Sequence, residues 1–189
     1  LGGGISFDTD GFNFVNANIS DMIFINNEID INLRFQYDNE TSSAQISNST
    51  FIVDRNYPTI ESLNHPTTIT NCIFFDNSDE GSYDIIFPED FDENTRIISH
   101  SLFFPNMNNL GLITDDGTNL IGNPLFCNFE NSDFTLAENS PAVGAGENGS
   151  NIGALGVGCG RIAQTIHVAI TGSDENGDGS ESNPFATIE

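Results

Sequence analysis

A six-residue motif recurs four times in this chain, beginning with isoleucine and ending with phenylalanine. The copies are ISDMIF from Ile19, ISNSTF from Ile46, ITNCIF from Ile69 and ISHSLF from Ile98. Successive isoleucines are 27, 23 and 29 residues apart. A motif that keeps its internal spacing while the connecting segments change length is typical of stacked coils whose loops project outward. The repeat therefore predicts a solenoid.

The motif also predicts which side chains fill the solenoid, because side chains of a strand alternate between its two faces. The first and sixth positions give inward ladders of Ile19, Ile46, Ile69 and Ile98 and of Phe24, Phe51, Phe74 and Phe103. Equivalent residues of stacked coils would lie about 4.8 Å apart. Each buried phenylalanine would contribute roughly 1.5–3 kcal/mol, and ring stacking about 0.5–1.5 kcal/mol more.

The two middle positions of the motif predict a corner in every coil. The third position holds residue types that tolerate left-handed backbone or cap a turn, namely Asp21, Asn48, Asn71 and His100. The fourth position is expected to face inward, at Met22, Ser49, Cys72 and Ser101. The thiol of Cys72 would then be buried and inert.

The rest of the sequence predicts an all-β chain. Apolar runs FNFV, INLRF, DIIF and LGLIT indicate further strands, and no long stretch shows helical spacing without Asn, Gly or Pro intruding. A β-sandwich is the alternative architecture. Its hairpins would need Asn-Gly or Asp-Gly turns at short intervals, and these dipeptides are scarce before residue 116. Stacked parallel coils are therefore favoured.

From Asn123 the composition changes to a segment dense in Gly and Pro. The string NPLF…DFTLAENSPAVGAG…NIGALG resembles the C-terminal closing segment of secreted right-handed parallel β-helix (pectin-lyase-like) proteins from bacteria. The segment GGGI at 2–5 and the repeated motif resemble the same proteins. The string TIHVAITGSDENGDGSESNPFATIE, from Thr165, is similar to the N-terminal first strand and turn of another such β-helix, as in proteins related to pectate lyases.

The resemblance implies an all-β, right-handed parallel β-helix in three parts. Residues 1–122 would be its last coils, and residues 123–160 a C-terminal cap that closes the final open coil. Residues 161–189 would be a linker and the truncated start of a second β-helix. We therefore expect a piece of a longer protein with tandem domains. The fold implies no particular activity, because lyases, hydrolases, epimerases and proteins without catalysis share it.

The chain is strongly acidic, with 28 Asp and Glu against 4 basic residues and a net charge of −24. Such a surface repels phosphate backbones and anionic lipid headgroups, so neither nucleic acid nor a membrane surface is an expected partner. Divalent cations are its natural counterions. No apolar run reaches the length that spans a bilayer.

One pattern suggests a calcium site. Asp174, Asn176, Asp178 and Gly179 form D-x-N-x-D-G, the first half of a calcium loop in which oxygens at positions one, three and five converge on the ion. The twelfth position, where a bidentate Glu belongs, is Phe185. Calcium held by Asp174, Asn176 and Asp178 is one interpretation, and an ordinary acidic turn between two strands is the other. No other cofactor is expected.

Cysteine usage bears on the compartment. Cys127 and Cys159 lie 32 residues apart at the two ends of the predicted cap. In an oxidising compartment they could form a disulfide worth roughly 3–4 kcal/mol, although sequence does not show that the two side chains meet. No closely spaced set of Cys and His predicts zinc.

We find no catalytic constellation in the sequence. Arg34, Arg55 and Arg96 are the basic candidates for proton abstraction beside a uronate carboxylate, but a surface role beside acids or backbone carbonyls is favoured for each. Asp115 and Asp116 are adjacent acids followed by Gly117, which predicts a turn rather than a hydrolase pair. The histidines, which are His65, His100 and His167, have no evident Ser or Cys partner.

These observations predict a scaffold segment of an extracellular or cell-surface protein that engages polysaccharide along a solenoid face. Binding, cleavage and isomerisation stay open, as does the oligomeric state. The alternative is a purely structural surface protein or adhesin. An outward row of Ile25, Ile52, Phe75 and Phe104 could stack on sugar rings, but packing beneath the long loops is the favoured interpretation.

Overall fold

The structure is a computed structural model that describes residues 5–9, 16–26, 31–35, 43–53, 58–63, 66–76, 84–86, 96–107, 114–162, 168–174 and 184–187. These residues form strands, two short 3-10 turns and loops. Within these ranges no α-helix occurs, and no helix combines the length and the apolar character that crossing a bilayer requires.

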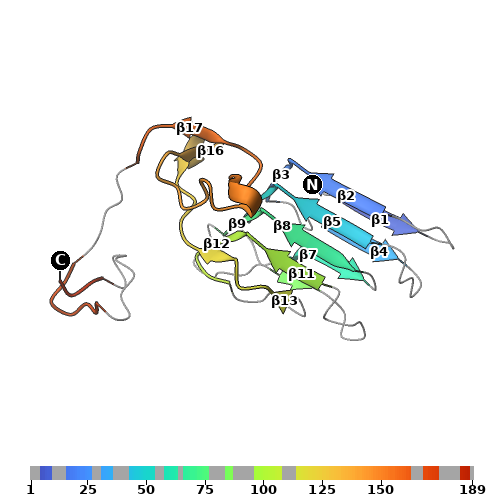
Figure 1. Cartoon of the computed structure of the whole chain (residues 1–189), viewed down its shortest axis with the longest axis horizontal. Coiled ribbons are helices and arrows are strands. Elements are labelled where there is room, and N and C mark those ends of the chain that lie inside the picture. Colours follow the sequence, from blue (N-terminus) through green and yellow to red (C-terminus); the bar gives the residue numbers. More distant parts are fainter. Residues whose placement is uncertain are drawn as a thin grey trace.

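The strands of the coils form three sheets in which all neighbours are parallel (Figure 1). Sheet A contains β1 (Ile5–Thr9), β4 (Ile31–Phe35), β7 (Pro58–Leu63) and β10 (Asp84–Ile86). Sheet B contains β2 (Asn16–Ser20), β5 (Ser43–Ser47), β8 (Thr67–Thr70), β11 (Arg96–Ser99) and β13 (Thr114–Asp115). Sheet C contains β3 (Ile23–Ile25), β6 (Thr50–Val53), β9 (Ile73–Asp76), β12 (Leu102–Phe104) and β14 (Leu120–Ile121).

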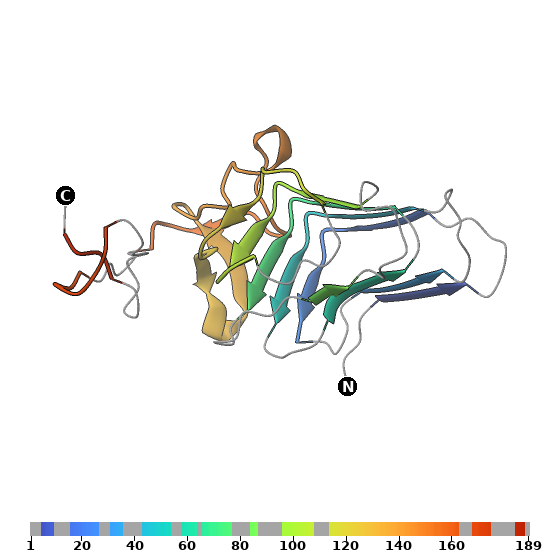
Figure 2. The same cartoon turned by 90° about the horizontal axis from the view of Figure 1, so that it is seen from below.

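The chain winds through these sheets coil by coil. From β1 to β12, strands of sheets A, B and C follow one another in sequence, and each strand pairs with its equivalent in the next coil (Figure 2). This all-β arrangement is compatible with a parallel β-helix. The β-sandwich alternative requires antiparallel hairpins, and the described coils contain none.

The interior is filled by the two ladders of the repeated motif. Ile19, Ile46, Ile69 and Ile98 lie in register across sheet B and are all buried. The buried rings of Phe24, Phe51, Phe74 and Phe103 stack across sheet C, with centroids 5.0, 4.9 and 4.9 Å apart and interplanar angles of 4–6°. Because one coil cannot bury its inner face alone, these contacts between coils hold the stacked strands together.

A left-handed residue turns the chain from sheet B to sheet C in each coil. The φ angles of Asp21, Asn48, Asn71 and His100 are 59°, 47°, 56° and 46°. Asn, Asp and His adopt this conformation more readily than most residues, which explains their presence at the third motif position.

The fourth position of the motif holds a small hydrogen-bond donor in three of the four copies. The hydroxyl groups of Ser49 and Ser101 donate to the carbonyl oxygens of Ser47 and Ser99 at 2.8 and 2.9 Å, and the thiol of Cys72 donates to the carbonyl of Thr70 at 3.4 Å. Ser49, Cys72 and Ser101 are fully buried.

Met22 does not face inward as predicted, and 40% of its surface is exposed. Its long thioether side chain carries no hydrogen to donate, so it cannot repeat the bond made by Ser49, Cys72 and Ser101. Only the Met22 backbone joins this ladder, because its N–H donates to Ser49 Oγ at 3.3 Å.

The cap contains β15 (Phe126–Asn128), η2 (Phe129–Asn131), β16 (Asp133–Ala137), η3 (Glu147–Gly149) and β17 (Val157–Cys159). Its three strands form a separate sheet, in which β16 is antiparallel to β15 and parallel to β17. A second apolar cluster joins cap residues Phe126, Phe134, Leu136, Ala142 and Ile152 to Ile52, Ile73, Phe75 and Leu102 of sheet C. The cap therefore covers the outer face of sheet C, as Figure 1 and Figure 2 show.

This position differs from the predicted closure of the last coil. In the described part of the chain, β13 and β14 pair on one side only, and Ile121 of β14 is 61% exposed. The cap covers the flank instead, where it buries the outward apolar residues Ile52 and Phe75.

Candidate functional site

The outward face of sheet B presents columns of side chains that repeat from strand to strand. One column of side chains runs across the strands through Asn18, Gln45, Thr68, Ile97 and Thr114, and all five are exposed. A second, less exposed column runs through Ser20, Ser47, Thr70 and Ser99, of which Ser20 is exposed and Ser99 is buried. We call these nine residues the sheet B surface. They alternate with the buried residues of the isoleucine ladder, so the solenoid core fixes which side chains this surface presents.

Hydrogen bonds between strands hold polar side chains on this face. The hydroxyl groups of Thr70 and Ser99 lie 3.1 Å apart, and Ser43 Oγ donates to Asn16 Oδ1 at 3.1 Å. None of the nine residues of the sheet B surface is charged, although the whole chain carries a net charge of −24. The surface offers hydroxyl and amide groups, each able to donate and accept hydrogen bonds.

The last described coil ends the core ladder with an acid. Asp115 lies in register with Ile98, the fourth isoleucine of the ladder, but its side chain is exposed. Asp115 Oδ1 accepts hydrogen bonds from the Gly117 N–H at 2.9 Å and from Asn119 Nδ2 at 2.6 Å. Asn119 also donates to the Ile98 carbonyl and accepts from the Ser101 N–H.

The neighbouring acid and histidine belong to the same turn. Asp116 Oδ1 accepts hydrogen bonds from the N–H and the hydroxyl of Thr118. Thr118 Oγ1 in turn accepts the His100 N–H at 2.8 Å and lies 3.3 Å from His100 Nδ1. The bonds at Asp115 and Asp116 close a turn around Gly117, whose φ is 80°. The geometry fits the predicted ordinary turn.

The carboxyl group of Asp174, the first residue of the predicted calcium loop, accepts three hydrogen bonds from Ala186 and Thr187. Its Oδ1 accepts the N–H groups of Ala186 and Thr187, both at 2.8 Å, and its Oδ2 accepts the Thr187 hydroxyl at 2.8 Å. The N–H and hydroxyl bonds from Thr187, with the N–H bond from Ala186, lower the pKa of the Asp174 carboxyl.

The other two predicted calcium ligands, Asn176 and Asp178, lie outside the described residues. Across the part of the chain that is described, no three His, Cys, Asp or Glu side chains cluster as metal ligands. Calcium binding at this loop stays a prediction.

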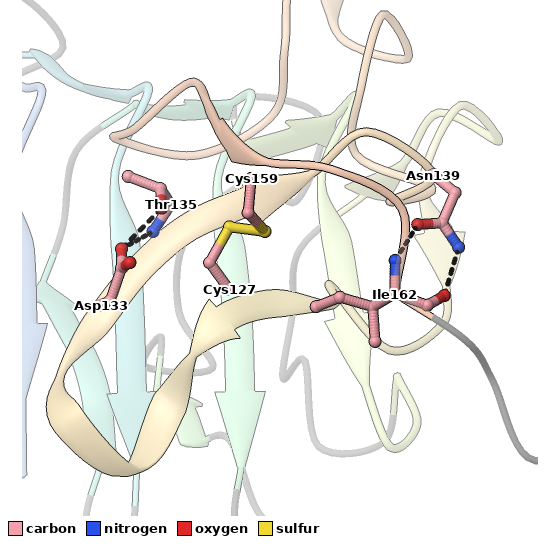
Figure 3. Close-up of a disulfide and its surroundings, with 6 residues drawn as sticks. All are labelled: Cys127, Asp133, Thr135, Asn139, Cys159 and Ile162. Carbon is pink, nitrogen blue, oxygen red and sulfur yellow. Dashed lines mark hydrogen bonds between the residues drawn. A yellow bond between two sulfur atoms is a disulfide. The ribbon is translucent and has the colours of Figure 1, made fainter.

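Cys127 and Cys159 form a disulfide that joins β15 to β17, with their Cα atoms 5.9 Å apart (Figure 3). Beside it, the Asn139 side chain donates to the Ile162 carbonyl and accepts the Ile162 N–H, both at 2.9 Å. These bonds fix the backbone where the chain leaves the cap. Asp133 also accepts the N–H and hydroxyl of Thr135 at the start of β16.

Arg96 does not lie on the surface as predicted. It is fully buried at the start of β11, in register with the buried Thr67. Burial lowers the pKa of its guanidinium group. Arg34 lies in β4, whereas Arg55, His65 and His167 lie outside the described residues.

Burial also raises the pKa of the Cys72 thiol to about 12. The thiol is therefore protonated at neutral pH. It is not an activated nucleophile.

Sequence reasoning missed the residues that attach the cap to the coils. Asn71 Oδ1 accepts the Glu147 N–H at 2.7 Å, and the Asn71 carbonyl accepts the Gly153 N–H at 2.8 Å. Thr50 Oγ1 accepts the Ala154 N–H at 3.0 Å. Gly153 marks the contact, because a Cβ atom there would lie 2.5 Å from Ile73 Cδ1. The glycine-rich stretch was the only sequence signal of such a close approach.

Comparisons with protein-family models, with curated proteins and with solved structures found no match to this chain.

Proposed function

We propose that this chain is a scaffold segment of a secreted or cell-surface protein of the right-handed parallel β-helix (pectin-lyase-like) kind, and that it engages an extracellular polysaccharide. The observation that carries the proposal is the sheet B surface. Equivalent polar side chains recur there on successive strands, at a spacing of about 4.8 Å. A polymer of repeating units can contact such a surface in the same way at each coil.

The disulfide supports the extracellular location. Disulfides such as Cys127–Cys159 persist in oxidising compartments and are rare in a reducing cytosol. The net charge of −24 keeps such a chain soluble and argues against nucleic acid or an anionic membrane as the partner.

The proposal is binding rather than cleavage. Asp115 and Asp116 are the paired acids of the described coils, and both accept hydrogen bonds within their own turn. Arg96 is buried inside the solenoid, where no substrate carboxylate reaches it. These placements support structural roles for Asp115, Asp116 and Arg96.

A structural surface protein or adhesin is the second candidate. The cap favours it, because Ile52 and Phe75 are buried under the cap and cannot stack on sugar rings. In this alternative the coils serve as a stalk and the sheet B surface is solvated without a ligand.

A glycan array probed with the purified chain separates the two candidates. Reproducible binding to polysaccharides supports the proposal, and a blank array supports the structural alternative. An ultraviolet assay for unsaturated uronate products, run on every bound polymer, tests binding against cleavage. Product formation would contradict the binding role proposed here.

A further inference from the structure

We infer that the sheet B surface from β2 to β11 binds a neutral polysaccharide laid across the strands. This inference rests on the proposed function and adds the extent of the binding surface and the chemical class of the ligand. It is carried by the distribution of charge, by the hydrogen-bonding groups on the surface, and by the acids that end it.

The charge distribution selects an uncharged ligand. The eight residues of this surface on β2, β5, β8 and β11 carry no charge, while the chain as a whole carries −24. A polyuronate approaching the chain is repelled by this field, and the sheet B surface offers no cation to compensate. A neutral glycan meets neither repulsion nor the desolvation of a buried charge.

The chemistry of the surface matches sugar hydroxyl groups. Asn18, Gln45 and Thr68 follow one another in register, and their amide and hydroxyl groups both donate and accept hydrogen bonds. Ile97, next in the column and 38% exposed, offers an apolar contact for the C–H face of a sugar ring. The bond to the buried Ser99 restricts the Thr70 side chain before a ligand arrives, which lowers the entropy cost of binding.

The surface has a defined end. At the last described coil, Asp115 takes the ladder position of Ile98 and Asp116 follows it, so two exposed carboxylates lie beyond β11. The four strands from β2 to β11 span about 14 Å at the usual strand spacing. Oligosaccharides shorter than this span contact fewer strands and bind more weakly.

A second copy of the chain is a poorer occupant. Protein interfaces concentrate aromatic residues, Met and Arg in their buried centres. The sheet B surface has Ile97 as its one large apolar residue. Two copies at −24 each would also repel one another.

The test is a binding titration of the full chain with soluble xylan, glucomannan and mixed-linkage β-glucan as neutral probes and polygalacturonate as the anionic probe. The surface variant combines Asn18→Ala with Gln45→Ala, which removes two exposed amides. The matched control is Asn148→Gly, which removes an exposed amide from the cap at a position whose φ of 58° glycine adopts freely. Circular dichroism checks that both variants fold.

We expect a neutral polymer to bind, with about tenfold weaker affinity for the surface variant and unchanged affinity for the control. Neutral binding that survives in the surface variant overturns this inference but leaves the proposed function standing. Preference for polygalacturonate overturns the neutral class. Failure of every polymer to bind contradicts the proposed function itself. A dimer in sedimentation that is lost only in the surface variant makes a second copy the occupant and also overturns the inference.

Discussion

The side-chain oxygen of Asn71 accepts a 2.7 Å hydrogen bond from the backbone N–H of Glu147, 76 residues further along the chain. Asn71 thereby serves two purposes. Its left-handed backbone turns the third motif copy at the corner, and its amide holds the cap against sheet C. One residue of the repeat thus connects the coils to the segment that covers them.

Replacing Asn71 by glycine should loosen the cap and leave the corner intact. Glycine keeps the left-handed backbone but removes the bonds to Glu147 and Ser150, so we expect a loss of about 1–3 kcal/mol in the free energy of unfolding. Hydrogen exchange should accelerate in residues 142–154. His100→Gly removes a side chain at the same motif position away from the cap, and equal acceleration in that variant would contradict the assignment.

Gly153→Ala should displace the cap more strongly than a turn substitution elsewhere. The new Cβ atom would lie 2.5 Å from Ile73 Cδ1, at a φ of 97°. Gly117→Ala is the control, because φ there is 80° and nothing lies within 4 Å. We expect the free energy of unfolding of the control to fall by about 1–2 kcal/mol, because alanine is strained at this left-handed backbone angle. Chemical denaturation should show a clearly larger loss for Gly153→Ala; equal losses would refute the close packing.

Phe74→Ala should be among the most destabilising single changes in the core. Its ring stacks on Phe51 and on Phe103 at 4.9 Å, so truncation removes two ring contacts and leaves a cavity. We expect a cost of about 3–5 kcal/mol in urea denaturation. Within the described ladder Phe24 stacks on Phe51 alone. Phe24→Ala should therefore lower the free energy of unfolding by less than Phe74→Ala does. The reverse order would show that the ladder does not bear the stability assigned to it.

Removing the disulfide should destabilise the cap in particular. The Cys127–Cys159 bond closes a separation of 32 residues, for which chain entropy gives roughly 3–4 kcal/mol. In Cys127→Ser with Cys159→Ser, exchange should rise in β16 and β17 and change little in the ladder strands. Cys72→Ser serves as the control for loss of a thiol, since a hydroxyl already occupies this position at Ser49 and Ser101. Uniform acceleration across all strands would show that the cap and coils unfold as one unit.

The turn held by Asp174 should weaken in acid. Hydrogen bonds from Thr187 and Ala186 lower the pKa of this carboxyl, so its contribution is complete above the unfolded-state value near pH 4. The contribution is lost as the pH falls through the lowered folded-state pKa. An NMR titration should show the Thr187 amide moving with a midpoint below about 4, and Asp174→Asn should abolish that step. A midpoint at or above the ordinary value would contradict these bonds.

The parts of the fold that repeat were the parts that could be predicted. Ile46 and Phe51 recur with fixed spacing in every coil, so periodicity alone indicates that both are inward and stacked. The corner at Asn48 follows from its residue type. Each of these features depends on local backbone chemistry repeated several times.

The features that escaped prediction depend on contacts between distant segments. Nothing near Asn71 in the sequence indicates that Glu147 returns to it, and nothing near Ile52 indicates that the cap covers that face. Arg96 is buried because it lies at an inward register position, although its charge suggests the surface. Met22 was predicted to face inward but is exposed. The corner requires a small hydrogen-bond donor, and an apolar sequence pattern does not reveal that requirement.

The disulfide and the Asn139–Ile162 bonds also determine how tension would travel through the molecule. A pull on the chain beyond Ile162 meets Asn139 first and then passes from Cys159 to Cys127 through the sulfur atoms. The residues between the two cysteines cannot be pulled out while the disulfide is intact. About 110 Å of extended chain is therefore not released under force. Force reaches β15 directly, and residues 128–158 of the cap lie outside the covalent path that carries the force.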